Sequence, residues 1–278
     1  KKLKPNAIER DINYCIGTGT WGLKNKNPRK GIAAVLQRLS YLQTLSSLRR
    51  VVSQVEKSGK LTEPRKLHCT QWGVICPFET PEGGSIGIVK NMALSSSITI
   101  PCSSDTVISC LEENDVIPLE EVKPFDIYES VKVFVNGDWF GQSMKPNELV
   151  KKLKKYRREG IINPYISISW NIDIGEIQIW SDGGRMYRPL YIIENNEINI
   201  NDEYISLMKK NNYQWKNLLH NHSNELEKPS LNKSILEYVD VIESDTLMIA
   251  MNKEQLDENS TSNYAYYNYT HCEIHASL

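Results

Sequence analysis

A basic segment between Lys24 and Lys66 holds the side chains best suited to bind phosphate groups. It contains eleven lysines and arginines and only two acidic residues, a net charge of +9 in a chain whose overall charge is −1. Such a concentration of positive charge in a nearly neutral protein is typical of a surface that faces nucleic acid. A solvated basic face without a ligand has the same composition, so both interpretations stay open at this point.

The stretch from Pro77 to Gly87 favours one specific backbone shape. Its two prolines fix φ and lack an amide donor, so they exclude a helix interior or a central strand, and its three glycines permit positive φ and close backbone approach. Glu79 and Glu82 flank Pro81, where their carboxylates could accept hydrogen bonds from backbone amides or pair with arginines. An ordinary surface loop does not explain this density of restraints beside buried-type residues, so we predict a shaped loop.

Two groups of zinc-type ligands form a rival site. They are His68, Cys69 and Cys76, and His271, Cys272 and His275. Neither group contains a Cys-x-x-Cys pair, and a structural zinc site is normally built from two close pairs of ligands. The chain also lacks the Gly-x-x-x-x-Gly-Lys-Ser/Thr pattern of phosphate-binding loops. We therefore predict no metal site and no independent nucleotide-binding enzyme.

The elements that must position the basic side chains can be placed from hydrophobic spacing. Apolar residues recur at helical spacing between Gly31 and Leu48, which predicts a helix over this range. Arg49 and Arg50 then lie at the C-terminal end of that helix, where its dipole favours cations.

Farther along the chain, a hairpin and a second helix are expected. Asn136-Gly137 lies between two apolar runs and predicts a type I′ turn, which needs positive φ at both central residues. Glu148–Arg158 is amphipathic, and its lysines and arginines are expected to form a solvated face. Short strands are expected at Ile166–Trp170, Glu176–Trp180, Leu190–Ile193, Val239–Ile242 and Leu247–Met251.

Alternation of short strands with a few helices predicts an α+β fold, built from several small mixed subdomains with short antiparallel strands. The 278 residues suffice for about two domains. No apolar run approaches the ~18–20 residues that span a bilayer, and the basic N-terminus has no apolar segment of a secretory signal behind it. The six cysteines are scattered, which favours reduced thiols. Since the sequence does not begin with Met, we expect a fragment or a processed chain.

The segment from Trp72 to Asn91 resembles the fork region of the second-largest subunit of multisubunit DNA-directed RNA polymerases. Its pattern is long and is interrupted by variable positions, so chance does not account for the agreement. The residues that carry the resemblance are Trp72-Gly73, Cys76-Pro77, Glu79-Thr80-Pro81-Glu82-Gly83, Gly87 and Lys90-Asn91.

The resemblance continues in order over nearly the whole chain and favours the eukaryotic, archaeal and large-DNA-virus branch. Further matching segments are Gly19–Gly22, Val35–Arg38 and Thr44–Arg50 in the fork, Val133–Gly137, Gly160–Pro164 and Asp182–Leu190 in the external domains, and Thr270–His275 in the hybrid-binding region. The chain departs from the family pattern at Val51–Val55 and at Ala276.

In this family the fork lies beside the active centre, near the downstream edge of the transcription bubble. The resemblance implies nucleic-acid-facing roles for Gln37, Arg38, Arg49, Arg50 and Arg65, and a position close to the active site for Glu82. Guanidinium groups suit this role because they bind phosphates bidentately and keep their charge. Helix capping or internal ion pairs are the alternative for Arg49 and Arg50, and a structural salt bridge is the alternative for Glu82.

The resemblance also implies a domain order. The expected domains are the end of the protrusion (1–20), the fork (21–103), external domain 1 (104–188), external domain 2 (189–265) and the start of the hybrid-binding domain (266–278).

The parent complex would be a nucleotidyltransferase that makes RNA on a DNA template with Mg²⁺, most of whose ligands come from the largest subunit. The resemblance also implies a Zn²⁺ module outside this part of the subunit. The expected partners are template DNA, the RNA–DNA hybrid, the largest subunit and other polymerase subunits, with no membrane. The complex would work in the nucleus, or in the cytoplasm or virion if viral. We expect no catalytic residue here and no activity of the isolated chain. A freestanding nucleic-acid-binding module is the alternative.

Overall fold

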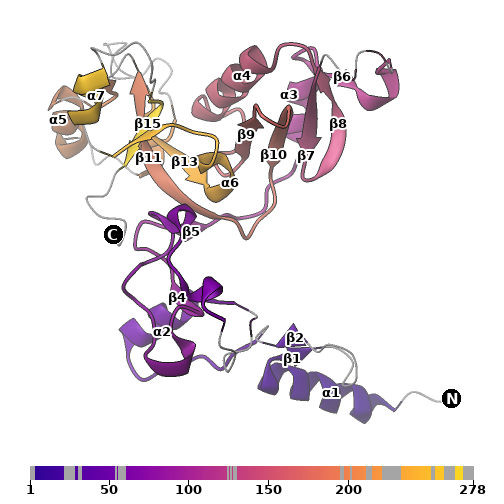
Figure 1. Cartoon of the computed structure of the whole chain (residues 1–278), viewed down its shortest axis with the longest axis vertical. Coiled ribbons are helices and arrows are strands. Elements are labelled where there is room, and N and C mark those ends of the chain that lie inside the picture. The colour runs from indigo at the N-terminus through magenta and orange to yellow at the C-terminus, as the bar shows by residue number, and fades with distance from the viewer. Residues whose placement is uncertain are drawn as a thin grey trace. The chain divides into compact units, whose positions relative to one another are not determined.

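The structure is a computed structural model that describes residues 4–21, 29–30, 33–53, 55, 61–123, 125, 127, 130–194, 197–200, 202–210, 215–220, 233–251, 254–259 and 267–271. The chain divides into a first unit within residues 1–94 and a second unit within residues 95–275. Short helices and small sheets occur in both units (Figure 1), which confirms the predicted α+β class. No helix among the described residues is long and apolar enough to cross a membrane.

Among its described residues, the first unit contains two α-helices and two short ribbons of paired strands. Its elements are α1 (Pro5–Thr18), β1 (Thr20–Trp21), β2 (Arg29–Lys30), α2 (Tyr41–Leu48), β3 (Arg50–Val52) and β4 (Val89–Asn91). β1 pairs with β2 and β3 pairs with β4, both antiparallel. Short 3-10 helices at Glu63–Arg65, Cys69–Gln71 and Gly83–Ser85 lie between β3 and β4.

α2 is shorter than the helix predicted over 31–48. The described residues from 33 to 40 are not helical, and the helix begins at Tyr41. Ser40 stops the helix from starting earlier, because its Oγ accepts a hydrogen bond from the amide of Gln43 at 3.2 Å and so caps the first turn. The apolar spacing before Ser40 therefore belongs to extended chain.

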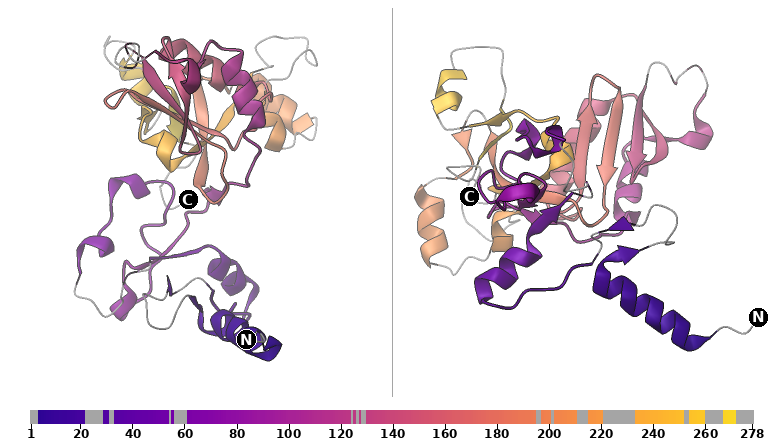
Figure 2. Two further views of the ribbon diagram at one scale, coloured as in Figure 1. Left: turned by 90° about the vertical axis from the view of Figure 1, so that its right-hand side faces the viewer. Right: turned by 60° about the horizontal axis from the view of Figure 1, so that its bottom comes forward.

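A five-stranded sheet forms one half of the second unit. Its strands lie in the order β6-β8-β7-β10-β9, and β10 runs parallel to β7. The elements of this module are α3 (Asp105–Glu112), β6 (Ile117–Pro118), β7 (Val131–Val135), β8 (Asp138–Ser143), α4 (Pro146–Arg158), β9 (Ser167–Asn171) and β10 (Glu176–Trp180). α3, α4 and the sheet stay together in each view of the molecule (Figure 2), with Leu111, Leu153 and Ile177 fully buried between them.

The predicted hairpin and second helix are confirmed. Asn136 and Gly137 join β7 to β8 with φ values of 51° and 90°, so both central residues of the turn have the positive φ that type I′ requires. α4 begins with Pro146 in its first turn, where the missing amide hydrogen is not needed.

A mixed sheet centred on β11 forms the other half of the second unit. β11 (Met186–Glu194) pairs antiparallel with β5, β12, β13 and β15, and β14 runs parallel to β15. The remaining elements are β5 (Ser97–Ile98), β12 (Glu197–Ile198), α5 (Asp202–Lys210), a 3-10 helix (Trp215–Leu218), β13 (Leu236–Asp240), α6 (Val241–Ser244), β14 (Ile249–Ala250), α7 (Glu254–Asn259) and β15 (Tyr269–His271).

The strand predicted at Val239–Ile242 ends earlier than expected. β13 stops at Asp240, whose Oδ1 accepts a hydrogen bond from the amide of Glu243 at 2.8 Å. This cap starts the short helix α6, so Val241 and Ile242 are helical.

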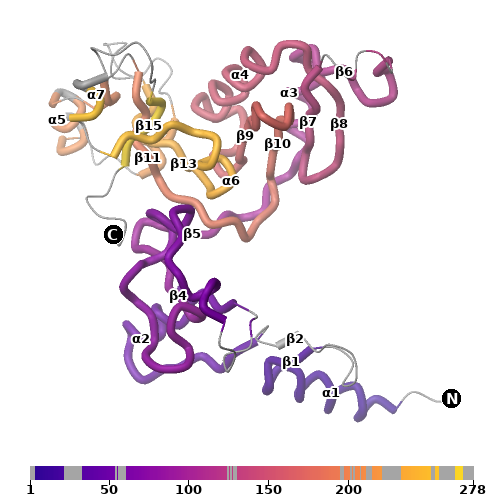
Figure 3. The backbone as a smooth tube through the Cα atoms, in the orientation of Figure 1, coloured from indigo at the N-terminus to yellow at the C-terminus, as the bar shows by residue number. Residues whose placement is uncertain are grey.

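The two halves of the second unit are joined by a neck of two chain segments that run side by side (Figure 3). The amide of Thr99 donates to the carbonyl of Arg185 at 2.9 Å, and the amide of Cys102 donates to the carbonyl of Ser181 at 3.0 Å. The chain therefore leaves the mixed sheet after β5, builds the five-stranded module, and returns into β11.

Candidate nucleic-acid interface

The predicted shaped loop closes on itself in the first unit. The amide of Cys76 donates to the carbonyl of Asn91 at 2.9 Å, and the amide of Ala93 donates to the carbonyl of Val74 at 2.9 Å. β4, at the end of this loop, pairs with β3. We call residues 76–91 the fork loop.

Thr80 and Asn91 tie the two sides of the fork loop together. The hydroxyl of Thr80 accepts a hydrogen bond from the amide of Gly87 and donates one to the carbonyl of Val89, both at 3.0 Å. Asn91 Nδ2 donates to the carbonyl of Glu79 at 3.1 Å. These two positions were not predicted as site residues, although both belong to the motif that carries the family resemblance.

Arg65 braces the fork loop from outside. Its Nη1 donates to the carbonyls of Gly84 and Ile86 at 2.9 and 2.8 Å, and its Nε donates to the carbonyl of Leu61 at 3.1 Å. Gly87 has a φ of +69°, and a Cβ atom there would lie 2.5 Å from the carbonyl oxygen of Arg65. The guanidinium of Arg65 thus holds the loop backbone, and its role toward nucleic acid stays a prediction.

Arg49 lies between α2 and the end of the fork loop. Its amide caps α2 by donating to the carbonyls of Leu45 and Ser46, and its Nη2 donates to the carbonyl of Ala93. The capping alternative considered for Arg49 is therefore present in the backbone. The side chain is half-buried.

Gln37, Arg38, Arg50 and Glu82 are exposed. Arg50 stands opposite Asn91 in the β3–β4 ribbon, so it borders the fork loop. Glu82 precedes the 3-10 helix Gly83–Ser85 inside that loop. The structure thus brings Arg49, Arg50, Arg65 and Glu82 to one loop and its ribbon.

Gln37 is linked to α2 rather than to the fork loop. Its Oε1 accepts a hydrogen bond from Gln43, and its carbonyl accepts one from the hydroxyl of Thr44 at 3.1 Å. Arg38 is its exposed neighbour in the same segment.

Ser85 falls in a Gly-x-Ser-x-Gly pattern, which can mark a hydrolase nucleophile. That role requires a sharp turn from a strand into a helix. Here Ser85 ends a short 3-10 helix that leads into the strand β4, so the required local structure is absent at this position.

In the second unit, the basic run on α4 is only partly the solvated face that was predicted: Lys151, Lys152 and Lys155 are exposed, but the end of the run is not. Arg157 is 1% exposed, and its guanidinium lies against the carboxylates of Glu237 and Glu243. Arg158 bonds to Glu237 at 2.9 Å and 3.1 Å. We call Arg157, Arg158, Glu237 and Glu243 the buried ion cluster. The prediction fails for Arg157 and Arg158 because helical spacing identifies a polar face but not the distant strand that covers it.

The buried ion cluster strongly perturbs one carboxyl group. Burial alone would raise the pKa of Glu237, but the opposite charges of Arg157 and Arg158 outweigh it and hold that pKa at about 2. Tyr269 also donates its hydroxyl to Glu237 at 2.8 Å, which further stabilises the charged form. The cluster joins α4 of the five-stranded module to β13 and α6 of the mixed sheet.

The described residues contain no group of three or more His, Cys, Asp or Glu side chains that could hold a metal ion. Of the two rival zinc groups, the described part of the chain includes His68, Cys69, Cys76 and His271, while Cys272 and His275 lie outside it. The absence of a metal site in this chain stays a prediction.

Comparison with known proteins supports the resemblance seen in the fork loop and beyond. Three family models match consecutive parts of the chain: RNA polymerase Rpb2, domain 3 at residues 34–98, domain 4 at residues 133–194, and domain 5 at residues 230–275. Their order is the order of the domains predicted from the sequence, whose boundaries stay a prediction.

Curated relatives align along nearly the whole chain. It is 40% identical to DNA-directed RNA polymerase II subunit RPB2 of Encephalitozoon cuniculi and 37% identical to DNA-directed RNA polymerase II subunit 2 of Arabidopsis thaliana, over 99% of the chain and 23% of each relative. DNA-directed RNA polymerase subunit 2 of Acanthamoeba polyphaga mimivirus is 31% identical over 99% of the chain and 24% of its own length. The chain thus spans about a quarter of the length of these relatives.

The three consecutive domain matches, in a chain with an α+β fold, define a class of protein: the Rpb2-type subunits of RNA polymerases. The chain belongs to the family of second-largest RNA polymerase subunits, with eukaryotic and viral members among its relatives. This membership does not favour the alternative of a freestanding nucleic-acid-binding module.

Proposed function

We propose that this chain is the part of a second-largest RNA polymerase subunit that positions nucleic acid beside an active centre located elsewhere in the complex. The observation that carries the proposal is the fork loop, closed by Thr80 and Asn91 and braced by Arg65. A loop held by this many backbone contacts can place its neighbouring charges with little loss of conformational freedom. The family relationship supplies the reaction, template-directed RNA synthesis.

The residues proposed to contact nucleic acid differ in whether their side chains are exposed or are already bonded to the protein backbone. Arg38 and Arg50 are exposed and can bind phosphate oxygens directly, whereas Arg49 and Arg65 contribute their charge from positions bound to backbone carbonyls. Gln37 can donate a neutral hydrogen bond beside Arg38. Glu82 stands at an exposed turn of the loop, where its carboxylate would lie close to the active site.

The proposed complex uses Mg²⁺ to promote nucleotidyl transfer, and a Zn²⁺ module lies in another part of the subunit. The described residues of this chain do not form a ligand set for either metal. The proposed partners are template DNA, the RNA–DNA hybrid, the largest subunit and the other polymerase subunits. The complex would work inside the cell, in the nucleus or, for a viral enzyme, in the cytoplasm or virion.

The experiment is a salt titration of DNA binding by the reconstituted polymerase. Arg50→Gln should weaken binding and lower the slope of log affinity against log salt by about 0.9, the loss of one duplex phosphate contact. Lys155→Gln is the matched control, because Lys155 is an exposed cation in the second unit, beside Glu159 at 3.6 Å. Equal slopes for Arg50→Gln and the wild type would contradict a phosphate contact at Arg50.

A second measurement concerns catalysis. The 278-residue chain alone should add no nucleotide to a primed template, because it supplies no metal-binding catalytic centre of its own in this proposal. Nucleotide incorporation by the purified chain, free of other subunits, would overturn the assignment of the active centre to the rest of the complex.

A further inference from the structure

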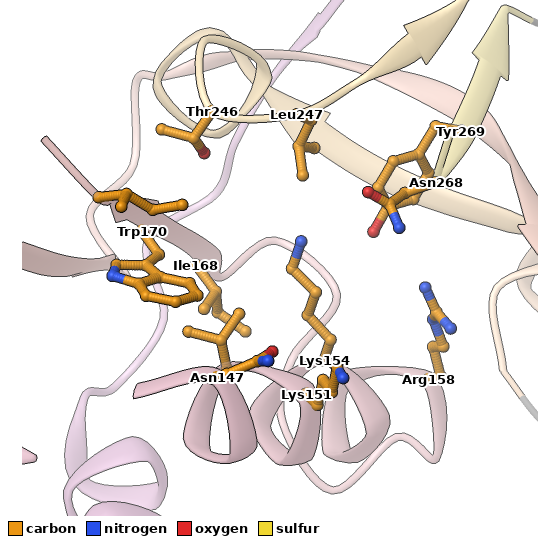
Figure 4. Close-up of a pocket in the computed structure, with 12 residues that line it drawn as sticks. Asn147, Lys151, Lys154, Arg158, Ile168, Trp170, Thr246, Leu247, Asn268 and Tyr269 are labelled. Carbon is orange, nitrogen blue, oxygen red and sulfur yellow. The ribbon is translucent and has the colours of Figure 1, made fainter. Parts of the chain in front are cut away.

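A groove with a volume of about 310 Å³ lies within the second unit, between α4, β9 and the segments that carry Leu247 and Tyr269 (Figure 4). Among the described residues, its lining includes three cations from α4, Lys151, Lys154 and Arg158, and no carboxylate. Much of the remaining wall is apolar, with one tryptophan. The proposed function of the fork loop makes no use of this groove.

The three cations of the groove differ in whether they already have a carboxylate partner. Lys154 Nζ lies 3.4 Å from Glu243, and Arg158 is bonded to Glu237, so the buried ion cluster holds both in place. Figure 4 shows Lys154 and Arg158 extending from α4 toward Tyr269. Lys151 is exposed, and within the described part of the chain it has no ion pair. Its charge is therefore available to an acidic ligand.

β9 borders the groove and is an edge strand of its sheet. On the neighbouring strand, the carbonyl of Ile179 accepts a hydrogen bond from the amide of Asn136, so the backbone of Ile179 faces away from β9. Ile179 stands opposite Ile168 in the antiparallel register. In an antiparallel ladder, two opposite residues either bond to each other or both face away, so Ile168 turns its amide and carbonyl groups toward the open edge. Trp170, two residues farther along the strand, faces the same way.

The buried ion cluster occupies one end of this edge. Arg157 donates to the carbonyl of Ile166 at 2.7 Å, and the amide of Ile168 donates to Glu243 at 3.4 Å. Two residues farther along, Trp170 lines the groove, and among the described residues its backbone makes no hydrogen bond outside the sheet. Where the edge meets the groove, its backbone amide and carbonyl groups are therefore available to pair with a strand from another chain.

We propose that this groove binds an extended acidic segment of a partner protein, which adds as a short strand to the open edge of β9 at Trp170. Main-chain hydrogen bonds to the edge would hold the segment, and alternate side chains would enter the groove. A carboxylate of the segment would face Lys151, and an apolar side chain would pack on Trp170 and Leu247. A nucleic acid strand lacks the alternating amide and carbonyl groups that this edge can pair with.

The test uses the full 278-residue chain and a fluorescein-labelled peptide of the sequence Glu-Asp-Leu-Glu-Leu-Asp-Leu-Glu-Asp, with binding followed by fluorescence anisotropy. Two further peptides carry N-methyl groups on alternate amides, one on each edge of the extended chain. Only one edge can pair with β9. One methylated peptide should therefore bind roughly tenfold more weakly and the other should bind like the parent, since two hydrogen bonds are worth about 1.4 kcal/mol.

The matched protein variants are Lys151→Glu and Lys155→Glu. They change the charge of the same helix equally, but Lys151 lines the groove and Lys155 does not. Lys151→Glu should lower the affinity for the peptide roughly fivefold or more, and Lys155→Glu should leave this affinity unchanged.

The proposal is overturned by an absence of saturable peptide binding, by equal losses of affinity for the two methylated peptides, or by equal effects of the two variants. Displacement of the peptide by single-stranded oligodeoxythymidine, with a larger loss of DNA affinity in Lys151→Glu, would assign the groove to nucleic acid instead.

Discussion

Arg157 and Glu243 lie 86 positions apart in the sequence, yet their guanidinium and carboxylate groups face each other through two parallel hydrogen bonds of 2.8 Å. Both side chains are almost completely shielded from solvent, at 1% and 0% exposure. A buried pair with this geometry is strongly coupled, because removal of either partner leaves the other charge shielded from water and without its bidentate partner.

Removal of the Arg157 guanidinium should destabilise the second unit. Arg157→Leu leaves the carboxylate of Glu243 buried, so we expect a loss of about 3–5 kcal/mol in the free energy of unfolding. Chemical unfolding followed by tryptophan fluorescence measures this loss. Lys155→Leu, on the exposed face of the same helix, should change stability by no more than about 0.5 kcal/mol.

A double variant separates the ion pair from general packing in this region. Arg157→Leu combined with Glu243→Leu removes the charge together with its partner and should regain part of the stability lost in Arg157→Leu. A double variant that is less stable than the sum of the two single losses would contradict coupling between these groups.

The stability of the second unit should fall in acid. Glu237 has an ordinary pKa of 4.5 when unfolded and a pKa of about 2 when folded, so the unfolded state binds a proton first as the pH drops. Its stabilising contribution, on the order of 3 kcal/mol, is fully present above pH 4.5 and is lost progressively as the pH falls to about 2. Unfolding free energies measured across this range should show the loss, and Glu237→Gln should flatten it.

His271 should stay neutral well below its ordinary pKa. Burial and then the charge of Arg188, whose Nη1 lies 2.8 Å from His271 Nδ1, lower the pKa of this imidazole to about 4. The unfolded state takes up this proton first, so the contribution of His271 to stability decreases as the pH falls from 6.5 to about 4. Titration of the imidazole carbons by NMR tests this, and Arg188→Met should raise the pKa. A midpoint near 6.5 in the wild type would be inconsistent with the buried arrangement.

Gly87 and Gly83 provide a matched pair in the fork loop. Both have positive φ, +69° and +77°, but a Cβ at Gly87 would lie 2.5 Å from a backbone oxygen, whereas at Gly83 nothing lies within 4 Å. Gly83→Ala should cost about 1 kcal/mol of backbone strain, and Gly87→Ala should in addition displace Arg65 from the loop. Hydrogen exchange at the amides of Ile86 and Ile88 should rise much more in Gly87→Ala. Equal exchange in the two variants would argue against the brace.

Local signals predicted part of the fold correctly. The Asn136-Gly137 turn and the helix ending at Arg158 depend on neighbouring residues, and both are present. The helix predicted from Gly31 failed because the Ser40 cap overrides apolar spacing.

Long-range contacts could not be predicted in this way. Helical spacing placed Arg157 on a polar face, but its partners come from β13 and α6, far along the chain. In the fork loop, the motif identified the segment, whereas the bonds made by Arg65 to carbonyl groups require the folded backbone. Charge and composition alone do not indicate whether an arginine binds a ligand or its own chain.

The neck between the two halves of the second unit has an evolutionary consequence. Because Thr99 and Cys102 run beside Arg185 and Ser181, the five-stranded module enters and leaves the mixed sheet at almost one point. A module connected in this way can be lengthened, trimmed or exchanged between lineages without rethreading β11. Divergence should nevertheless be constrained at one place: any replacement must bring its own cation to the acidic side chains of β13 and α6, since these would otherwise be left uncompensated.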